Sequence, residues 1–307
     1  MAGSGFGCEG QGMKNGATSS HDTSGGRWTL YAGCLHVIFW SVFFSILVLA
    51  GWARFAHIKE IGFGWEPDGI ENYVNAKAFQ NTIFGHHFHR RFHPVPHIIY
   101  GQFFSLLGDT DYTVKIANCI FDLFNTVLVF ALAAALLQNR WISLSPMAMY
   151  ALAPKVLLFA RREMTLPVAT FWSTLAFFCL LGLIKTLSSP PMAVTLPAST
   201  SPSRGTGSEI AKLFSREPSR LRRALFWLAA MGAFLGFGVC SHYTVAFAVP
   251  GYMFSILVVR LVTKTEKGKS ALLLVRDVTV FGVALALVAL VFCSLFPLED
   301  FLRLFQS

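Results

Sequence analysis

The run TLYAGCLHVIFWSVFFSILVLAGWA, from Thr29 to Ala53, decides the class of fold. It contains no charged side chain, and as a helix it is long enough to cross a hydrocarbon core of about 30 Å. The whole chain agrees with it, because 54% of the 307 residues are hydrophobic and only 13% are charged. Soluble domains carry about 25% charged residues. The sequence therefore predicts a helical membrane protein. We interpret the first run as a signal anchor, since it is too long for the apolar core of a signal peptide.

Further apolar runs predict an all-α, polytopic membrane bundle. Together with the first run they make about seven spans. The expected spans cover residues 29–53, 114–137, 142–160, 165–187, 224–240, 244–261 and 278–296. Two shorter pieces of the first outer loop, an amphipathic stretch at 73–79 and an apolar stretch at 97–107, predict interfacial helices.

The remaining segments give the domain organisation. Residues 1–28 are rich in Gly and Ser and predict a disordered cytosolic tail, while 29–307 form one membrane domain. Within it, residues 55–112 make an outer, lumenal loop and residues 188–223 a basic cytosolic linker. With the N-terminus in the cytosol, 15 of the 25 Lys and Arg residues lie on the cytosolic side, as the positive-inside rule expects. Topology and anionic lipids thus explain the net charge of +9, and nucleic acid is not an expected partner.

The first outer loop carries the stretch Glu66-Pro67-Asp68-Gly69-Ile70-Glu71-Asn72-Tyr73. Carboxylates are costly in a membrane protein, so an acidic cluster at the mouth of a bundle is the first candidate for an active site. Asp68, with Glu66 and Glu71 beside it, could accept a proton from a sugar or protein hydroxyl. The alternative is an ordinary turn at Pro67-Asp68-Gly69 with a solvated carboxylate.

Two arginine pairs, Arg90-Arg91 and Arg161-Arg162, lie at the expected membrane interface. Paired guanidinium groups suit a lipid phosphate, which they grip through two parallel hydrogen bonds. The alternative is that they are snorkelling side chains at helix ends.

Five histidines lie between His86 and His97. Pro94 and Pro96 disrupt a helical zinc pair of His93 and His97, so we expect solvated or substrate-contacting histidines and no metal site. Inside or near the spans, Asp122, Asn125, Lys155 and His242 are weaker candidates, and Asp122 could simply pair with a neighbouring helix. Five of the six cysteines fall in apolar spans, where they act as small packing residues without metal or disulfide spacing.

The order of these elements resembles the GT-C superfamily of integral membrane glycosyltransferases. Asp68–Tyr73 followed by Asn75–Phe79 is similar to the first-loop motif of the protein-mannosyltransferase and aminoarabinose-transferase branch, and His93–Pro96 to its His-Pro-Pro segment. Trp65–Asp68 can equally be set against the His-Pro-Asp-Glu motif of dolichol-linked and GPI-anchor mannosyltransferases. Two further segments match less closely: Ala160–Met164 lies where these families carry a second-loop motif but lacks its usual Asp, and Gly232–His242 resembles their Gly-rich span.

The resemblance implies an inverting glycosyltransferase of the endoplasmic reticulum membrane, or of the plasma or inner membrane in a bacterium. It would move a sugar, with mannose as the first candidate, from a polyprenyl-phosphate donor to a lipid, glycan or protein acceptor. By this analogy Asp68 is the catalytic carboxylate and Glu71 supports it. The substrate-binding residues implied are Tyr73, Arg90, Arg91, His93, Arg161, Arg162, Glu163 and His242. No metal site is expected among the residues implied, and the resemblance leaves open whether the reaction uses a divalent cation.

Two other functions stay open. The missing second-loop Asp and a chain shorter than most members favour a non-catalytic GT-C-like subunit that binds lipid or stabilises a partner enzyme. A small transporter ranks last, because no span is broken near its centre by paired Gly and Pro and no internal repeat is evident.

Overall fold

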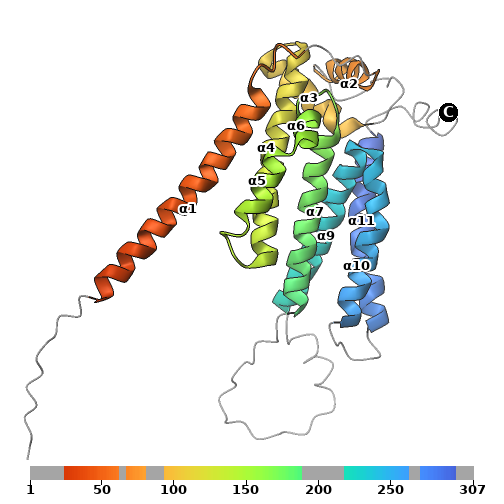
Figure 1. The fold of residues 1–307 in the computed structure, drawn as a ribbon. Coiled ribbons are helices and arrows are strands. Elements are labelled where there is room, and N and C mark those ends of the chain that lie inside the picture. Colours follow the sequence, from red (N-terminus) through yellow and green to blue (C-terminus); the bar gives the residue numbers. More distant parts are fainter. Residues whose placement is uncertain (1–23, 62–66, 81–92, 189–217, 263–269, 295–307) are drawn as a thin grey trace, which may run out of the picture. The chain divides into compact units, whose positions relative to one another are not determined.

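The computed structural model describes residues 24–61, 67–80, 93–188, 218–262 and 270–294, which form helices and turns without a strand (Figure 1). The chain divides into two units, Met1–Val42 and Phe43–Ser307. Helix α1 (Ser24–Phe55) runs through the boundary, and it supplies all the described residues of the first unit. There, Nε1 of Trp40 donates to Nε2 of His36, one turn earlier, at 3.0 Å. All later helices belong to the second unit.

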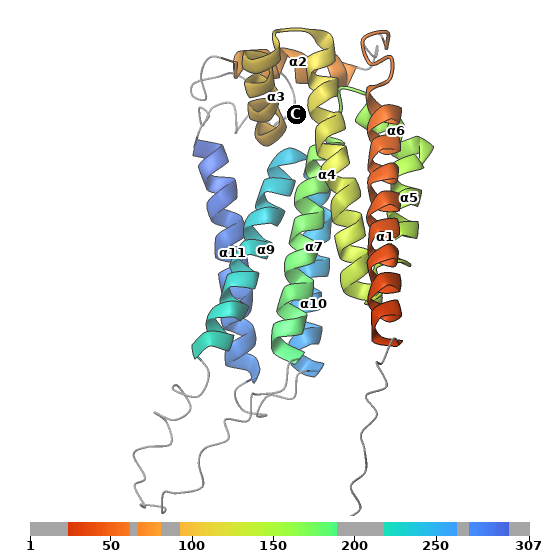
Figure 2. The same ribbon diagram turned by 90° about the vertical axis from the view of Figure 1, so that its left-hand side faces the viewer.

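The second unit is a bundle of long helices with short helices across one end (Figures 1 and 2). The long ones are α4 (Asp111–Leu137), α7 (Leu166–Ser188), α9 (Pro218–Ser241), α10 (Val249–Val262) and α11 (Ser270–Ser294). At one end lie α2 (Pro67–Ala78) and α3 (Pro94–Leu107), which match the two interfacial pieces expected in the first outer loop. We call this the α2–α3 end.

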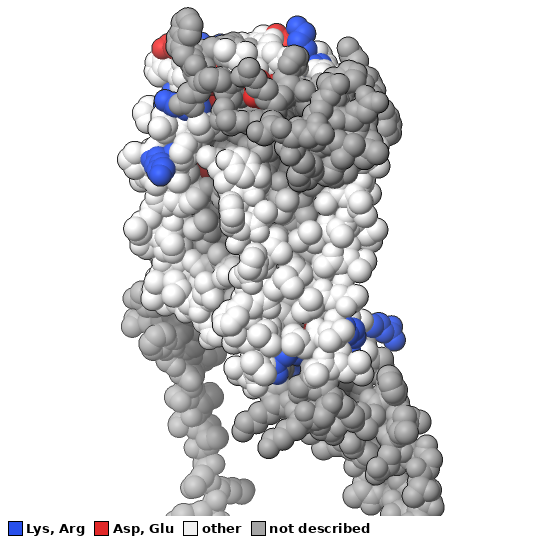
Figure 3. All heavy atoms as spheres, turned by 90° about the vertical axis from the view of Figure 1, so that its right-hand side faces the viewer, with Lys and Arg blue, Asp and Glu red and all other residues white. Residues whose placement is uncertain are grey.

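Six helices of the described chain are long and apolar enough to cross a membrane. They are Gly33–Phe55, Tyr112–Leu137, Leu166–Ser188, Arg220–Ser241, Tyr243–Val262 and Ala271–Phe292. On the face shown in Figure 3, Lys and Arg side chains gather near the two ends, and the band between them is almost without charge. These features fit a multi-pass integral membrane protein, and six of the expected spans correspond to these helices.

The expected span at 142–160 is not one helix. It is divided into α5 (Leu144–Leu152) and α6 (Pro154–Ala160), with Ala153 between them in an extended conformation. Proline has no backbone N–H and disfavours helical geometry at the residue before it, so Pro154 ends the first helix and begins the second. In Figure 1, α4 leaves the α2–α3 end and α7 starts from it, so α5 and α6 together return the chain to that end.

Some expected segments lie elsewhere or outside the described residues. Helix α1 begins at Ser24, inside the tail expected at 1–28, and α9 begins at Pro218, inside the linker expected at 188–223. Residues 1–23 and 189–217, which make up most of the predicted tail and linker, are outside the described residues.

Close helix contacts depend on glycine at particular positions. A Cβ on Gly101 of α3 would stand 2.8 Å from the backbone carbonyl carbon of Phe79 and 2.9 Å from the carbonyl oxygen of Ala76. Helix α2 and the residue after it therefore lie directly against α3 only because residue 101 has no side chain. On the other side of the bundle, a Cβ on Gly232 of α9 would overlap the carbonyl oxygen of Phe281 on α11.

Candidate functional site

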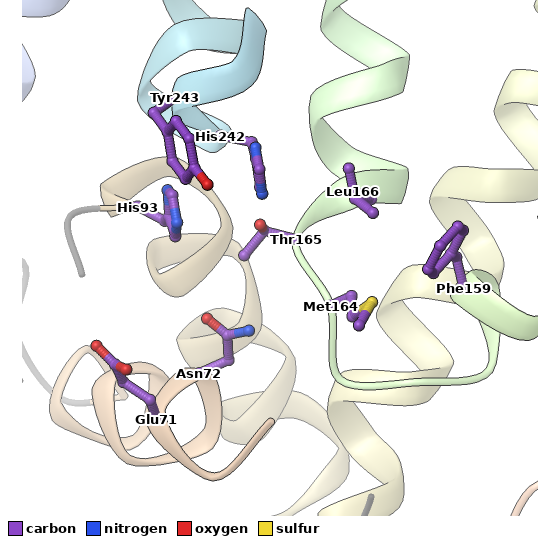
Figure 4. A pocket seen from close by; sticks show the side chains of 9 residues that line it. All are labelled: Glu71, Asn72, His93, Phe159, Met164, Thr165, Leu166, His242 and Tyr243. Carbon is purple, nitrogen blue, oxygen red and sulfur yellow. The ribbon is translucent and has the colours of Figure 1, made fainter. Parts of the chain in front are cut away.

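A polar cavity of about 220 Å³ lies at the α2–α3 end of the second unit (Figure 4). Its wall is made by α2, the start of α3, the end of α6, the turn into α7 and the start of η1 (Tyr243–Ala248). The lining residues are Glu71, Asn72, His93, Phe159, Met164, Thr165, Leu166, His242 and Tyr243. A carboxylate, an amide, two imidazoles and two hydroxyl groups thus surround one space.

The turn between α6 and α7 is fixed by side chains that bind its backbone carbonyls. Nδ2 of Asn118 on α4 donates to the carbonyl oxygens of Arg162 at 2.7 Å and Met164 at 2.8 Å. The hydroxyl of Tyr100 on α3 lies 2.6 Å from Oδ1 of Asn118 and 3.1 Å from the Met164 carbonyl. Buried polar groups need such partners, because an unmade hydrogen bond costs about 1–3 kcal/mol. This turn, which forms the floor of the cavity, is therefore rigid.

A third carbonyl of this turn, that of Glu163, binds helix α2 on the opposite wall of the cavity. Nδ2 of Asn72 on α2 donates to the Glu163 carbonyl at 2.7 Å. The Glu163 side chain turns inward, where Oε1 lies 3.0 Å from Nζ of Lys115, and both side chains are almost fully buried. Nζ of Lys115 also donates to the carbonyl of Ile61. Lys115 thus joins the turn that follows α1 to the floor of the cavity.

His97 completes the contact between α2 and α3. Its Nε2 lies 2.9 Å from Oδ1 of Asn72. Since the Asn72 amide nitrogen donates to the Glu163 carbonyl, Oδ1 accepts, and Nε2 of His97 carries the proton. Complete burial, and then the nearby His93, hold the pKa of His97 well below its usual value of about 6.5. His97 is therefore a neutral donor at physiological pH.

Three rings stand together on the other side of the cavity. The imidazoles of His93 and His242 are stacked with centroids 5.1 Å apart, and Tyr243 stacks on His242 at 4.8 Å. Nδ1 of His242 accepts from the backbone N–H of Thr244 at 3.3 Å and so caps η1. The ring stack joins the beginning of α3 to the turn after α9 (Figure 4).

A second and more open cavity, of about 320 Å³, adjoins the first. Its lining residues, from α4, α7 and η1, are Leu132, Leu166, Ala169, Thr170, Ser173, Thr174, Phe177, Thr244 and Val245. Leu166 borders both cavities, and Tyr243 of the first is followed by Thr244 of the second. The second cavity lies along the membrane-spanning part of α7, so the polar cavity continues into an apolar groove with a few hydroxyl groups. We call it the α4–α7 groove.

The intramembrane carboxylate Asp122 has a structural partner. Its Oδ2 accepts from Nε of Arg54 at 2.7 Å, and its Oδ1 accepts from the Tyr150 hydroxyl at 2.7 Å. Arg54 is fully buried and donates further to the carbonyl of Ala151 at 3.0 Å. The pair joins the end of α1 to α4 and α5, as expected for a buried charge in a membrane protein. Neither Arg54 nor Asp122 lines the polar cavity.

Three of the residues expected in the site, Glu71, His93 and His242, line the polar cavity together. Asp68 lies in the first turn of α2, one turn before Glu71, and its side chain is outside the described part of the structure. Arg90 and Arg91 are also outside it.

The side chains of Tyr73, Arg161 and Glu163 face elsewhere. The hydroxyl of Tyr73 donates to Oδ1 of Asp109 at 2.5 Å, and Nη2 of Arg161 donates to the Ala56 carbonyl at 2.6 Å. Arg162 and Glu163 contribute their backbone carbonyls to the fixed turn, as described above. Hydrogen bonds from Lys77 and Tyr73 lower the pKa of the Asp109 carboxyl group, so this contact is an ion pair that holds α2.

Several residues of the site were not expected from the sequence. They are Asn72, Tyr100, Lys115, Asn118, Thr165 and Tyr243. The expectation for His97, a solvated or substrate-contacting histidine, was wrong, because its ring is completely buried and binds Asn72 outside the lining of the cavity. One signal was present, because Lys115 and Asn118 are polar residues inside an apolar run, where unpaired polar groups are costly. The contacts themselves could not be read from the sequence, since Asn118 and Arg162 are separated by 44 positions, and Asn72 and Glu163 by 91.

The described residues contain no group of three or more His, Cys, Asp or Glu side chains that could hold a metal ion. The fold and the cavity define a multi-pass helical membrane protein with a polar site at one end of its bundle. Comparison of the chain with protein-family models, curated proteins and solved structures finds no match.

Proposed function

We propose that this protein is a GT-C-like membrane glycosyltransferase. It transfers a sugar, with mannose as the first candidate, from a polyprenyl-phosphate donor to a lipid, glycan or protein acceptor on the lumenal face of the endoplasmic reticulum. One observation carries the proposal: a polar cavity with a carboxylate and two imidazoles adjoins an apolar groove at the level of the membrane. A ligand with a polar head and a long hydrocarbon tail matches both parts.

The transfer needs a carboxylate and a site for the leaving phosphate. The acceptor hydroxyl gives its proton to the carboxylate while its oxygen attacks the anomeric carbon, and the bond from that carbon to the phosphate oxygen breaks. Glu71 lines the cavity, and Asp68 lies one turn away on α2. We assign the base to Glu71, with Asp68 as its neighbour. The imidazoles of His93 and His242 supply donors for the phosphate, and α7 begins at Leu166 on the same wall, with the end of the helix that attracts anions.

The proposal includes a topology of seven crossings. Helices α5 and α6 form the seventh, because they return the chain between two helices that run in the same direction (Figure 1). The α2–α3 end then faces the lumen, and the basic residues at the other ends of α7 and α9, such as Lys185, Arg222 and Arg223, face the cytosol.

A second function is favoured by one contact. The carboxylate of the second loop, Glu163, is buried against Lys115 and lies outside the lining of the cavity. A subunit that binds a lipid-linked sugar without transferring it would keep the cavity and the groove, and would need no second carboxylate.

The deciding experiment measures sugar transfer from radiolabelled mannosyl polyprenyl phosphate in membranes that contain the chain. Glu71→Gln keeps the size of the side chain and removes its basicity, so transfer should fall by about 10²–10⁴-fold. Asp68→Asn is measured beside it. Glu60→Gln is the control, because the Glu60 side chain is 74% exposed on the turn after α1. Full transfer by both Glu71→Gln and Asp68→Asn would defeat the proposal, and donor binding without transfer by the folded wild type would favour the subunit.

A further inference from the structure

The short helix α2 carries Glu71, so whatever fixes the rotation of α2 about its axis also fixes where this carboxylate points. A helix of 12 residues is marginal by itself. On one side it is held by two contacts with the Asp109 carboxylate. The Tyr73 hydroxyl lies 2.5 Å from Oδ1, and Nζ of Lys77 lies 2.6 Å from Oδ2. On the other side it is held by Asn72, the residue next to Glu71.

Asn72 forms the middle of a chain of hydrogen bonds through three elements. Its Nδ2 donates to the Glu163 carbonyl on the α6–α7 turn, and its Oδ1 accepts from Nε2 of His97 on α3. Both partners are immobile: His97 is completely buried, and the turn is fixed by Asn118 and Tyr100. An amide with both ends engaged cannot rotate or exchange its nitrogen and oxygen without losing two hydrogen bonds.

We propose that His97 is a positioning residue, which acts through Asn72 to orient the Glu71 carboxylate toward the cavity. His97 does not line the cavity, so its ring has no contact with a ligand there. Its neutral imidazole serves as a buried donor whose position is set by α3. The inference deepens the proposed glycosyl transfer and rests on it for one of its two measurements.

The chemistry of the contact allows a rescue. Glutamine at position 97 carries an amide N–H that can reach Oδ1 of Asn72, whereas phenylalanine fills the space of the ring without a donor. His97→Gln should therefore keep the position of Glu71, and His97→Phe should lose it. Thr126→Val is the control, because it removes a buried hydroxyl that binds only the Asp122 carbonyl of its own helix α4, and it leaves Asn72 and the α6–α7 turn intact.

The first measurement does not need activity. Carboxyl groups of the purified full chain are coupled to glycine ethyl ester with a water-soluble carbodiimide, and the rate at Glu71 is compared with that at Glu60 in the same digest by mass spectrometry. The second measurement is kcat and KM for sugar transfer. A misplacement of about 1 Å at a reacting group can cost about 10²-fold in rate. His97→Phe should change the relative coupling rate by about fivefold or more and lower kcat by about 10- to 100-fold.

The expected pattern is that His97→Gln and Thr126→Val stay within about twofold of the wild type in the coupling of Glu71. If His97→Phe does not fold, Asn72→Ala interrupts the same chain and should move the coupling rate in its place. Equal effects of His97→Gln and His97→Phe, or of Thr126→Val and His97→Phe, would overturn the inference. If the variants show the expected coupling pattern but the wild type transfers no sugar, the positioning role would be supported and the proposed function defeated.

Discussion

Asparagine amides connect the helices around the candidate site. Asn72, Asn118 and Asn125 each donate a side-chain N–H to a backbone carbonyl of the segment 162–167. Each of these bonds crosses from one helix to a segment far away in the sequence. A single such bond contributes about 0.5–1.5 kcal/mol, and an unsatisfied buried partner costs about 1–3 kcal/mol. The site is therefore held by a few residues whose loss is expected to be more costly than the number of their contacts suggests.

The ion pair of Lys115 and Glu163 gives a prediction for single residues. Removing one partner leaves a buried charge without compensation, which typically costs about 3–5 kcal/mol. Lys115→Met should therefore lower the thermal unfolding temperature strongly, while Lys115→Met combined with Glu163→Leu should recover part of the loss. Lys59→Met serves as the control, since Lys59 lies exposed at the same end of the bundle. Unfolding of the detergent-solubilised protein measures all of these variants, and additive losses in the double variant would contradict the pairing.

His97 gives a prediction for pH. Burial lowers its pKa in the folded protein, so below a pH of about 6.5 the unfolded chain binds a proton that the folded chain does not. The stability that this histidine contributes is complete above that pH and is lost as the pH falls toward the pKa of the folded state. The slope is at most about 1.4 kcal/mol per pH unit. The unfolding temperature of the wild type should therefore drop more between pH 7.5 and 5.5 than that of His97→Gln. Equal drops would show that His97 does not titrate in this way.

At the scale of elements, the contact between helices α9 and α11 depends on two glycines of α9, Gly232 and Gly236. A Cβ at residue 232 would overlap the carbonyl oxygen of Phe281, and one at residue 236 would stand 2.9 Å from Cβ of Val288. Gly232→Ala should therefore destabilise the bundle, by about 1–3 kcal/mol as typical for overpacking. Gly251→Ala on α10 is the matched control, because a Cβ there meets no atom within 4 Å. Replacing a helical glycine at such a position is neutral or stabilising.

Thermal unfolding of the two alanine variants tests this contact. A loss in Gly232→Ala without a loss in Gly251→Ala is the expected result. Equal stability of the two variants would mean that α9 and α11 can separate slightly without cost.

Helices were easier to predict from the sequence than the contacts between them. Runs of apolar residues predicted the six long helices, because burial in hydrocarbon needs an unbroken apolar stretch. The division at Pro154 was missed because the apolar run continues on both sides of it, although proline itself is a known signal. The limits of α11 were also missed: the helix begins at Ser270, eight positions before the expected span, and includes the charged residues Arg276 and Asp277.

The candidate site was predictable only in part. The sequence indicated Glu71, His93 and His242 because polar residues next to membrane spans are conspicuous. It could not show that Tyr73 and Arg161 would turn to Asp109 and to a backbone carbonyl. Such choices depend on which helices lie close together, and that follows from packing rather than from local pattern.

At the scale of the whole molecule, buried charges and the break in α5–α6 bear on topology. Arg54 and Asp122 lie near the α2–α3 end, while Arg260 binds Asp277 between α10 and α11, near the opposite end. Each pair neutralises a charge that would be costly in hydrocarbon, so the long helices can contain charged residues, as α4 contains Asp122 near its middle. The number of crossings then depends on whether α5 and α6 traverse the membrane together.

Labelling of introduced cysteines tests this number. If α5 and α6 cross as a pair, the turn after α4 and the end of α7 lie on one side of the membrane, and the turn after α1 lies on the other. In sealed vesicles from the endoplasmic reticulum, an impermeant maleimide should label Arg140→Cys and Lys185→Cys directly, above the level of the parent chain. Lys59→Cys should react only after the vesicles are opened, since its exposed turn would face the lumen. If the chain crossed only six times, α7 would run in the opposite direction, and Lys185→Cys would be protected together with Lys59→Cys. Direct labelling of Arg140→Cys with protection of Lys185→Cys would therefore refute the seventh crossing, and with it the lumenal placement of the turn that forms the floor of the cavity.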